Sequence, residues 1–231
     1  MQELLMDRTY HGALDLSGAF GAFALTDPEG NVLIDAARRL RGRESAVLAQ
    51  WVEELLAEQN LTIRDVKRWS VGSGPGSFTG MRLAAALVTG WSSYHSDVAC
   101  RNVPTALIPA QQLRAQEGET AGILFDGRNA EMLVYETVFR HGQWRGTGFC
   151  AVWDAPAAET ALAEHRFDHL AAFADDLPAL ERLLAPELAA AITVCETPSA
   201  LPLLYADAPA FDNDLTQLIY IRPAVFPPKT K

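Results

Sequence analysis

A glycine-rich turn between a short apolar segment and a long apolar one restricts the fold of this chain more than any other feature. Residues 68–73 predict a strand, residues 74–80 (GPGSFTG) predict a tight turn, and residues 79–95 predict a helix. The N–H groups of such a turn and the positive end of the following helix can hold an anion. The pattern therefore predicts an α/β protein and makes the turn a candidate binding site.

The turn fits no standard nucleotide-binding motif. Ser77 stands where a GxGxxG motif needs its third glycine, and no Gly-Lys-Ser/Thr follows as in a P-loop. Two interpretations stay open. In one, Gly74, Gly76, Ser77 and Thr79 bind an anion or a nucleotide, and Asp15, at the end of the first predicted strand, contacts the magnesium ion of that nucleotide. In the other, the glycines fit a tight turn that Ser77 or Thr79 caps, and Asp15 caps a turn of its own.

The predicted elements repeat in their order along the chain. Three strands within residues 12–40 form a meander, and a helix follows at residues 44–60. A second meander occupies residues 121–152, and a helix at 178–191 and a strand at 191–196 lie beyond it. The repeat predicts two lobes of similar architecture.

Pro104 and Pro109 mark the joint between these lobes. We therefore expect an N-terminal lobe of residues 1–106 and a smaller C-terminal lobe of residues 107–231, in which residues 219–225 close the ordered part.

Both long helices of the first lobe are apolar over more of their surface than one packing face needs. The apolar residues of the first helix cover about 180° of its circumference and those of the second about 220°, whereas one packing face needs about 100°. We expect part of each arc to form the core and the rest to contact a partner chain. The candidate interface residues are Val47, Leu48, Trp51, Val52, Leu55, Leu83, Leu87 and Trp91.

Composition excludes several classes of protein. The chain has 231 residues, of which 49% are hydrophobic, and a formal net charge of -10. It can bury a core, and it repels phosphate backbones, so we expect no direct binding of nucleic acid. The N-terminus lacks the layout of a signal peptide, and no apolar run reaches the ~20 residues of a membrane span. We expect a cytoplasmic protein without membrane contact.

The chain offers no evident metal site. His165 and His169 lie one helical turn apart, a spacing typical of metal ligands, but the sequence shows no third ligand beside them. The three cysteines are widely spaced and fit neither a disulfide framework nor a zinc motif. We expect exposed histidines and reduced thiols.

The glycine turn also carries a family resemblance. Residues 74–80 together with Arg82 resemble the GPGSFTGLR hallmark of the TsaB (YeaZ) family, the accessory proteins of tRNA threonylcarbamoyladenosine biosynthesis. ALDLS at residues 13–17 resembles the opening LDTS strand of that family. FDGRNAEMLVY at 125–135 is similar to its DARRGEVY segment through Asp126, Arg128 and Glu131, and IYIRPA at 219–224 is similar to its closing PxYLR.

Two departures identify the sequence as a divergent member. Arg43, Glu44 and Ser45 stand where the family has His-Ser-Glu, and FADDLP at residues 173–178 replaces the glycine turn of the second lobe. The resemblance implies an actin-like (ASKHA, ribonuclease H-like) α/β fold of two related lobes, the second one reduced. It also implies that the complete nucleotide and metal site belongs to the catalytic paralogue, TsaD.

The function implied by the resemblance is that of a scaffold. It predicts a non-catalytic chain that supports a TsaD-like subunit, with a TsaE-like ATPase as a further partner, a homodimer when the chain is alone, and tRNA bound only indirectly. No cofactor is expected on this chain, because ATP and metal belong to the partner complex. The alternatives are an actin-like ATPase, a metallopeptidase of the glycoprotease type, and a homodimeric binding module with an unrelated client.

Overall fold

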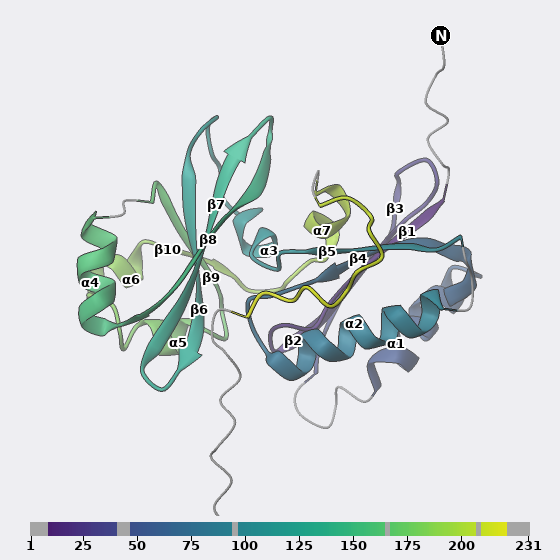
Figure 1. Ribbon diagram of the computed structural model, residues 1–231, viewed down its shortest axis with the longest axis horizontal. Helices are drawn as coiled ribbons and strands as arrows, with labels where there is room; N and C mark the ends of the chain where they lie inside the picture. Colours follow the sequence, from purple (N-terminus) through teal and green to yellow (C-terminus); the bar gives the residue numbers. More distant parts are fainter. Residues whose placement is uncertain (1–8, 41–46, 94–96, 165–166, 207–208, 221–231) are drawn as a thin grey trace, which may run out of the picture.

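Two five-stranded sheets of the same topology organise the chain (Figure 1). The computed structural model describes residues 9–40, 47–93, 97–164, 167–206 and 209–220. The strands are β1 (Tyr10–Asp15), β2 (Phe20–Thr26), β3 (Val32–Arg39), β4 (Val66–Gly72), β5 (Ala99–Val103), β6 (Thr120–Arg128), β7 (Glu131–Arg140), β8 (Gln143–Asp154), β9 (His169–Phe173) and β10 (Ile192–Cys195).

The strand order confirms that the two lobes are related. The first sheet runs β3-β2-β1-β4-β5, and the second runs β8-β7-β6-β9-β10 when it is read in the same direction. In each sheet the first three strands in sequence pair antiparallel, the fourth pairs in parallel with the first, and the fifth pairs in parallel with the fourth. Each lobe therefore contains an antiparallel meander whose first strand is extended by two parallel strands. This is the predicted actin-like architecture.

The helices of the first lobe pack on one core. They are α1 (Leu48–Glu58), the short 3-10 helix η2 (Ile63–Asp65) and α2 (Phe78–Ser92). The side chain of Ser77 caps α2, because its hydroxyl oxygen accepts the N–H of Gly80 at 3.2 Å. Both α1 and α2 contribute to the same apolar cluster, whose largest fully buried side chain is Trp69 of β4.

The helices that follow β5 are short. They are α3 (Leu107–Ala110), α4 (Ala155–Glu164), α5 (Leu177–Leu180), α6 (Pro186–Ala190) and α7 (Leu201–Tyr205). The prediction of one helix over residues 178–191 is wrong, because the chain forms two separate turns of helix and α6 begins anew at Pro186. Proline has no backbone N–H to donate to a carbonyl oxygen of the preceding turn, so a continuous helix through this position is disfavoured.

The end of the described chain returns to the first lobe. We call residues 209–220 the C-terminal strap; it runs across the first lobe beside α2 and is coloured yellow in Figure 1. The backbone N–H of Asn213 donates to the carbonyl of Cys100 at 2.9 Å, and that of Ile219 donates to Ser73 at 2.8 Å. The predicted boundary therefore needs a correction: α7 and the strap follow residue 107 in sequence but pack on the N-terminal lobe.

Arg101 fixes this returning segment. It is almost completely buried on β5, and its guanidinium donates to the carbonyls of Leu203, Leu204 and Pro209 while its Nε donates to Ser70 at 2.9 Å. A buried guanidinium that satisfies several carbonyls holds them rigidly, because each lost bond would leave a buried polar group unpaired. The strap is therefore part of the folded first lobe.

Candidate functional site

Asp15 is buried at the carboxyl end of β1 inside a hydrogen-bonded network. Its carboxylate accepts the Thr105 hydroxyl at 2.6 Å and the backbone N–H of Ser17 at 3.0 Å, and the Ser17 hydroxyl lies 2.8 Å from Oδ1. The Thr105 hydroxyl oxygen accepts the N–H of Gly74 at 3.1 Å. Burial raises the pKa of Asp15, while the bonds from Thr105 and Ser17 lower it. The carboxylate is thus occupied by groups of its own chain.

The glycine turn lies directly on the backbone that follows β1. A Cβ on Gly76, whose φ is +152°, would overlap the carbonyl of Ser17, and a Cβ on Gly80 would overlap the carbonyl of Leu16. The backbone N–H of Ser77 donates to the Ser17 carbonyl at 2.6 Å. The glycines are therefore required for close contact between two backbone segments.

Several N–H groups that a phosphate would need already have partners inside the chain. That of Ser73 donates to the carbonyl of Val103, that of Gly74 to Thr105, and that of Ser77 to Ser17. This geometry supports the structural interpretation of the turn. These contacts do not favour a bound ligand at the turn. Ligand binding there, by Gly74, Gly76, Ser77 and Thr79, stays a prediction.

The space between the lobes beside Asp15 is small. A cavity of about 30 Å³ is lined by Asp15 and Phe20 of the first lobe and by Asp176, Cys195 and Glu196 of the second. Sites for drug-sized ligands occupy about 300–1,000 Å³. The residues present do not fit a nucleotide, because the cavity is too small and its walls are acidic.

Asp176 is a second acid of this cavity whose pKa burial shifts. Burial raises its pKa to about 7, and the neighbouring carboxylates of Asp126 and Asp175 act in the same direction, while the backbone N–H of Asp126 lowers the pKa. Asp175 in turn accepts the Arg39 guanidinium at 2.6 Å across the lobes. An acid with a pKa this high is partly protonated near neutral pH, which reduces repulsion in the cavity.

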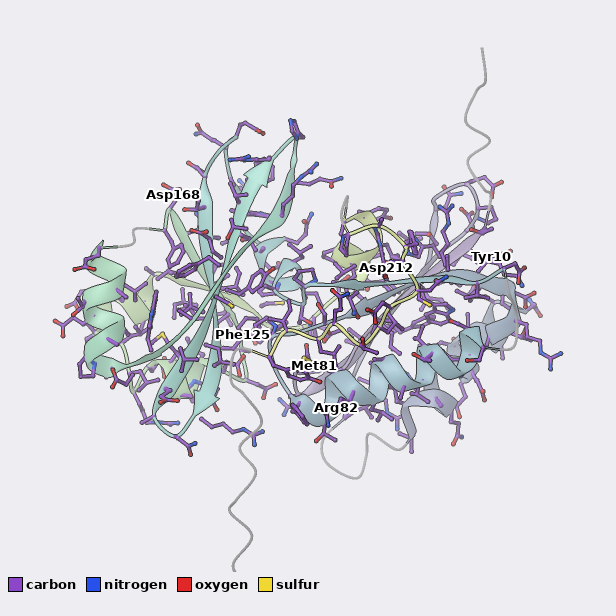
Figure 2. The ribbon with its side chains drawn as sticks, in the orientation of Figure 1. Tyr10, Met81, Arg82, Phe125, Asp168 and Asp212 are labelled. Carbon is purple, nitrogen blue, oxygen red and sulfur yellow. The ribbon has the colours of Figure 1, made fainter. Side chains whose placement is uncertain are left out.

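The outer face of α2 differs from an ordinary solvent-facing helix. It carries one charged side chain, Arg82, and otherwise small or apolar residues. Its exposed residues are Phe78, Thr79, Arg82, Ala86, Thr89 and Gly90. Arg82 projects from this helix near its N-terminal end (Figure 2). Exposed helix faces usually carry several charges, so this face is a candidate interface.

Residues 42–183 match the family model described as "TsaD: tRNA N6-adenosine threonylcarbamoyltransferase". The match covers more than half of the chain. The chain belongs to the TsaD family.

Solved structures agree with this family assignment in fold. This TsaD-family chain resembles an uncharacterized protein with similarity to the peptidase YeaZ from Pseudomonas aeruginosa at 24% identity and a TM-score of 0.69, over 93% of this chain and 100% of that one. It resembles YeaZ from Pseudomonas aeruginosa at 24% identity and a TM-score of 0.64, over 85% of this chain and 89% of that one. No curated protein sequence matches significantly. The predicted resemblance to the TsaB (YeaZ) family is confirmed.

The structure corrects part of the interface predicted for this TsaD-family chain. Leu48 and Val52 are fully buried and Trp51 is 8% exposed, so these three form the core of their own lobe. The expectation that they are available to a partner is wrong in this structure, because α1 turns this side toward its own sheet. The other predicted residues are less buried and stay candidates: Val47 is exposed, and Leu55, Leu83, Leu87 and Trp91 are half-buried at the margin of the core.

The predicted histidine pair shows no metal geometry in the part of the chain that the structure describes. His169 Nε2 lies 2.9 Å from a carboxylate oxygen of Glu119, and His165 lies outside the described residues. No cluster of three or more metal-ligating side chains occurs among the described residues. Within the same residues, no helix combines the length and apolar character needed to cross a membrane.

Sequence reasoning missed two residues of the site. Thr105, which bonds to both Asp15 and Gly74, lies beside the proline joint and carries no motif signal. Tyr220, whose hydroxyl oxygen accepts the Nε–H of Arg82 at 3.1 Å, is far from it in sequence. Of the predicted closing segment, residues 219–225, the structure describes only 219–220, which form no strand, and the remainder, with Arg222, lies outside the described residues.

Proposed function

We propose that this chain is a non-catalytic partner of a TsaD-like subunit in the modification that forms threonylcarbamoyladenosine in tRNA. The observation that carries the proposal is the outer face of α2, which is solvent-exposed, carries a single charge and is otherwise built from small or apolar residues. Such a face lets a second helix approach closely, and covering it removes apolar surface from water. The resemblance to the TsaB (YeaZ) family, which implies support of a TsaD-like subunit, supplies the class of partner.

Gly90 is the residue of α2 that its own chain explains least. A Cβ at this position would meet nothing within 4 Å, and its φ is ordinary for a helix, so no contact of the monomer requires glycine. Glycine in a helix costs about 1 kcal/mol relative to alanine. A close approach by a partner helix accounts for this cost.

The site beside β1 supports a non-catalytic role. Asp15 is saturated by hydrogen bonds from Ser17 and Thr105, and the turn donors nearest to it are used within the chain. An actin-like ATPase needs a carboxylate and turn N–H groups that face the nucleotide. We therefore place the chemistry on the TsaD-like subunit, where threonylcarbamoyl passes from its adenylate to the tRNA adenosine.

The net charge of the chain and the shape of the α2 face indicate the remaining partners. A net charge of -10 opposes direct contact with tRNA, so the tRNA is held by the catalytic subunit. In the absence of that subunit the same α2 face pairs with a second copy, and a TsaE-like ATPase joins the full complex. This work takes place in the cytoplasm, where the tRNA is.

The test is reconstitution with purified components. The TsaD-like subunit from the same genome should form a stable complex with this chain and should modify tRNA faster in its presence. This chain alone should show negligible ATP turnover, and Asp15→Asn should leave that background unchanged. ATP hydrolysis by the isolated chain at about 1 per second or faster, lost in Asp15→Asn, would instead support the actin-like ATPase.

A further inference from the structure

Phe78, Arg82 and Tyr220 form an exposed cluster, which we call the aromatic clamp. The guanidinium carbon of Arg82 lies 3.7 Å from the centre of the Phe78 ring, and the two aromatic rings lie 5.0 Å apart. Phe78 is 37% exposed and Tyr220 is 38% exposed. Two aromatic rings thus fix one arginine in open solvent, at the N-terminal end of the α2 face.

The clamp orients the arginine and leaves its outer donors available. The Nε–H of Arg82 donates to the hydroxyl oxygen of Tyr220 at 3.1 Å. Arg82 is exposed, and among the described residues no carboxylate forms an ion pair with it. An arginine held by stacking loses little further freedom when it forms a bidentate pair with a planar anion.

We propose that the aromatic clamp is the docking site for a carboxylate of the TsaD-like subunit, an Asp or Glu side chain on the helix that covers α2. This inference rests on the proposed function, which makes the α2 face the interface, and it adds the chemistry of the contact. Arg82 is the only charged residue of α2, so its pairing fixes the register of a partner on an otherwise uncharged helix.

The charge of the whole chain favours a protein carboxylate over an RNA phosphate. Binding of a phosphate backbone needs a stripe of basic residues, and α2 supplies a single arginine on a molecule of net charge -10. The neighbours of Arg82 on the face are apolar or small, so a covered pair would lie in a medium of low dielectric, which strengthens it.

The C-terminal strap supplies Tyr220, one of the three residues of the aromatic clamp. Tyr220 is held next to α2 because the N–H of Ile219 donates to the Ser73 carbonyl at 2.8 Å, close to the glycine turn. The strap therefore links the turn to the docking site. The proposal assigns Tyr220 a positioning role, since its hydroxyl oxygen accepts the Nε–H of Arg82 and the centre of its ring lies 5.7 Å from the guanidinium carbon.

The experiment compares variants for binding to the purified TsaD-like subunit from the same genome by isothermal titration calorimetry, with thermal melting as the check on folding. Arg82→Gln should weaken binding about 30-fold or more, since the partner carboxylate loses its charge-assisted bonds. Arg82→Lys should weaken it about 10-fold, because the charge stays and the planar fork is lost. Arg64→Gln, at an exposed arginine on η2, is the matched control and should bind as the unmodified chain does.

Salt dependence and a second variant separate the two proposals. Affinity of the unmodified chain should fall as salt rises, and that of Arg82→Gln should change less. If Arg82→Gln binds like the control while Gly90→Glu abolishes binding, the face is the interface and the clamp proposal is wrong. If Arg82→Gln and Gly90→Glu both bind normally, or if the unmodified chain does not bind the TsaD-like subunit, the proposed function and the clamp proposal both fail. If Arg82→Gln loses affinity for tRNA, measured without the TsaD-like subunit, but keeps its affinity for that subunit, the ligand is a phosphate and the carboxylate proposal is overturned.

Discussion

The carbonyl oxygen of Ser17 accepts the N–H of Ser77 at 2.6 Å and lies where a Cβ of Gly76 would stand. This one contact joins the end of β1 to the glycine turn before α2. It explains why the turn needs glycine, and it leaves the Asp15 carboxylate enclosed beneath the turn by Ser17 and Thr105.

Gly76→Ala should destabilise the chain strongly. The substitution puts a methyl group into the Ser17 backbone, at a φ of +152° that other residues rarely adopt. We expect a loss of about 2 kcal/mol or more in the free energy of unfolding, measured by urea denaturation. Gly18→Ala, where a Cβ meets nothing within 4 Å, is the matched control and should change stability far less. Equal effects at both positions would contradict the turn geometry.

Leu48→Asp and Val47→Asp should behave in opposite ways. Leu48 is fully buried, so an ionised carboxylate there would lie unpaired in the core and should prevent folding. Val47 is 36% exposed one residue earlier, and its variant should stay folded with a melting temperature near that of the unmodified chain. Circular dichroism on the two proteins checks this. A folded Leu48→Asp would mean that α1 does not face the core as described.

The titration of Asp176 should contribute a loss of stability as pH rises from about 4 toward 7, against an opposite contribution from His11, whose folded-state pKa burial lowers to about 3. The folded-state pKa is raised from 3.8 to about 7, so the folded state keeps a proton that the unfolded chain has already lost. The stabilising contribution is complete below the unfolded pKa and is lost as pH passes the folded pKa. Asp176→Asn should remove the contribution of this residue, so the stability of the variant relative to the unmodified chain should rise between about pH 4 and 7, and at pH 8 the variant should be the more stable by about 1 kcal/mol or more. A stability difference between the two proteins that does not change across this pH range would contradict the raised pKa of Asp176.

Gly90→Ala should stabilise the monomer while weakening the complex. The new methyl group meets open space in the isolated chain, and alanine is the better helix former by about 1 kcal/mol. In the proposed interface the same group would hold the partner helix away. Thermal melting of the monomer should therefore rise as affinity for the TsaD-like subunit falls, and a parallel rise in both would count against close helix contact.

The turn, the meanders and the duplicated lobe could be predicted because they depend on local sequence. Glycines at residues 74–80 and alternating strands carry their own signals. The side of α1 that is buried could not be predicted, since the core that covers Leu48 and Val52 also includes Leu215 of the strap, far along the chain. The same limit hid the contact between Arg82 and Tyr220, which are 138 positions apart.

The measurement that tests the central claim most directly is the binding of Gly90→Glu to the TsaD-like subunit by analytical ultracentrifugation. Gly90 is exposed and its Cβ position is open, so the variant should fold with an unchanged monomer sedimentation coefficient. The account predicts a heteromeric complex with the unmodified chain and none with Gly90→Glu at the same concentrations, because a charge would lie in an apolar contact. A complex of undiminished affinity with Gly90→Glu would contradict the assignment of α2 as the docking face.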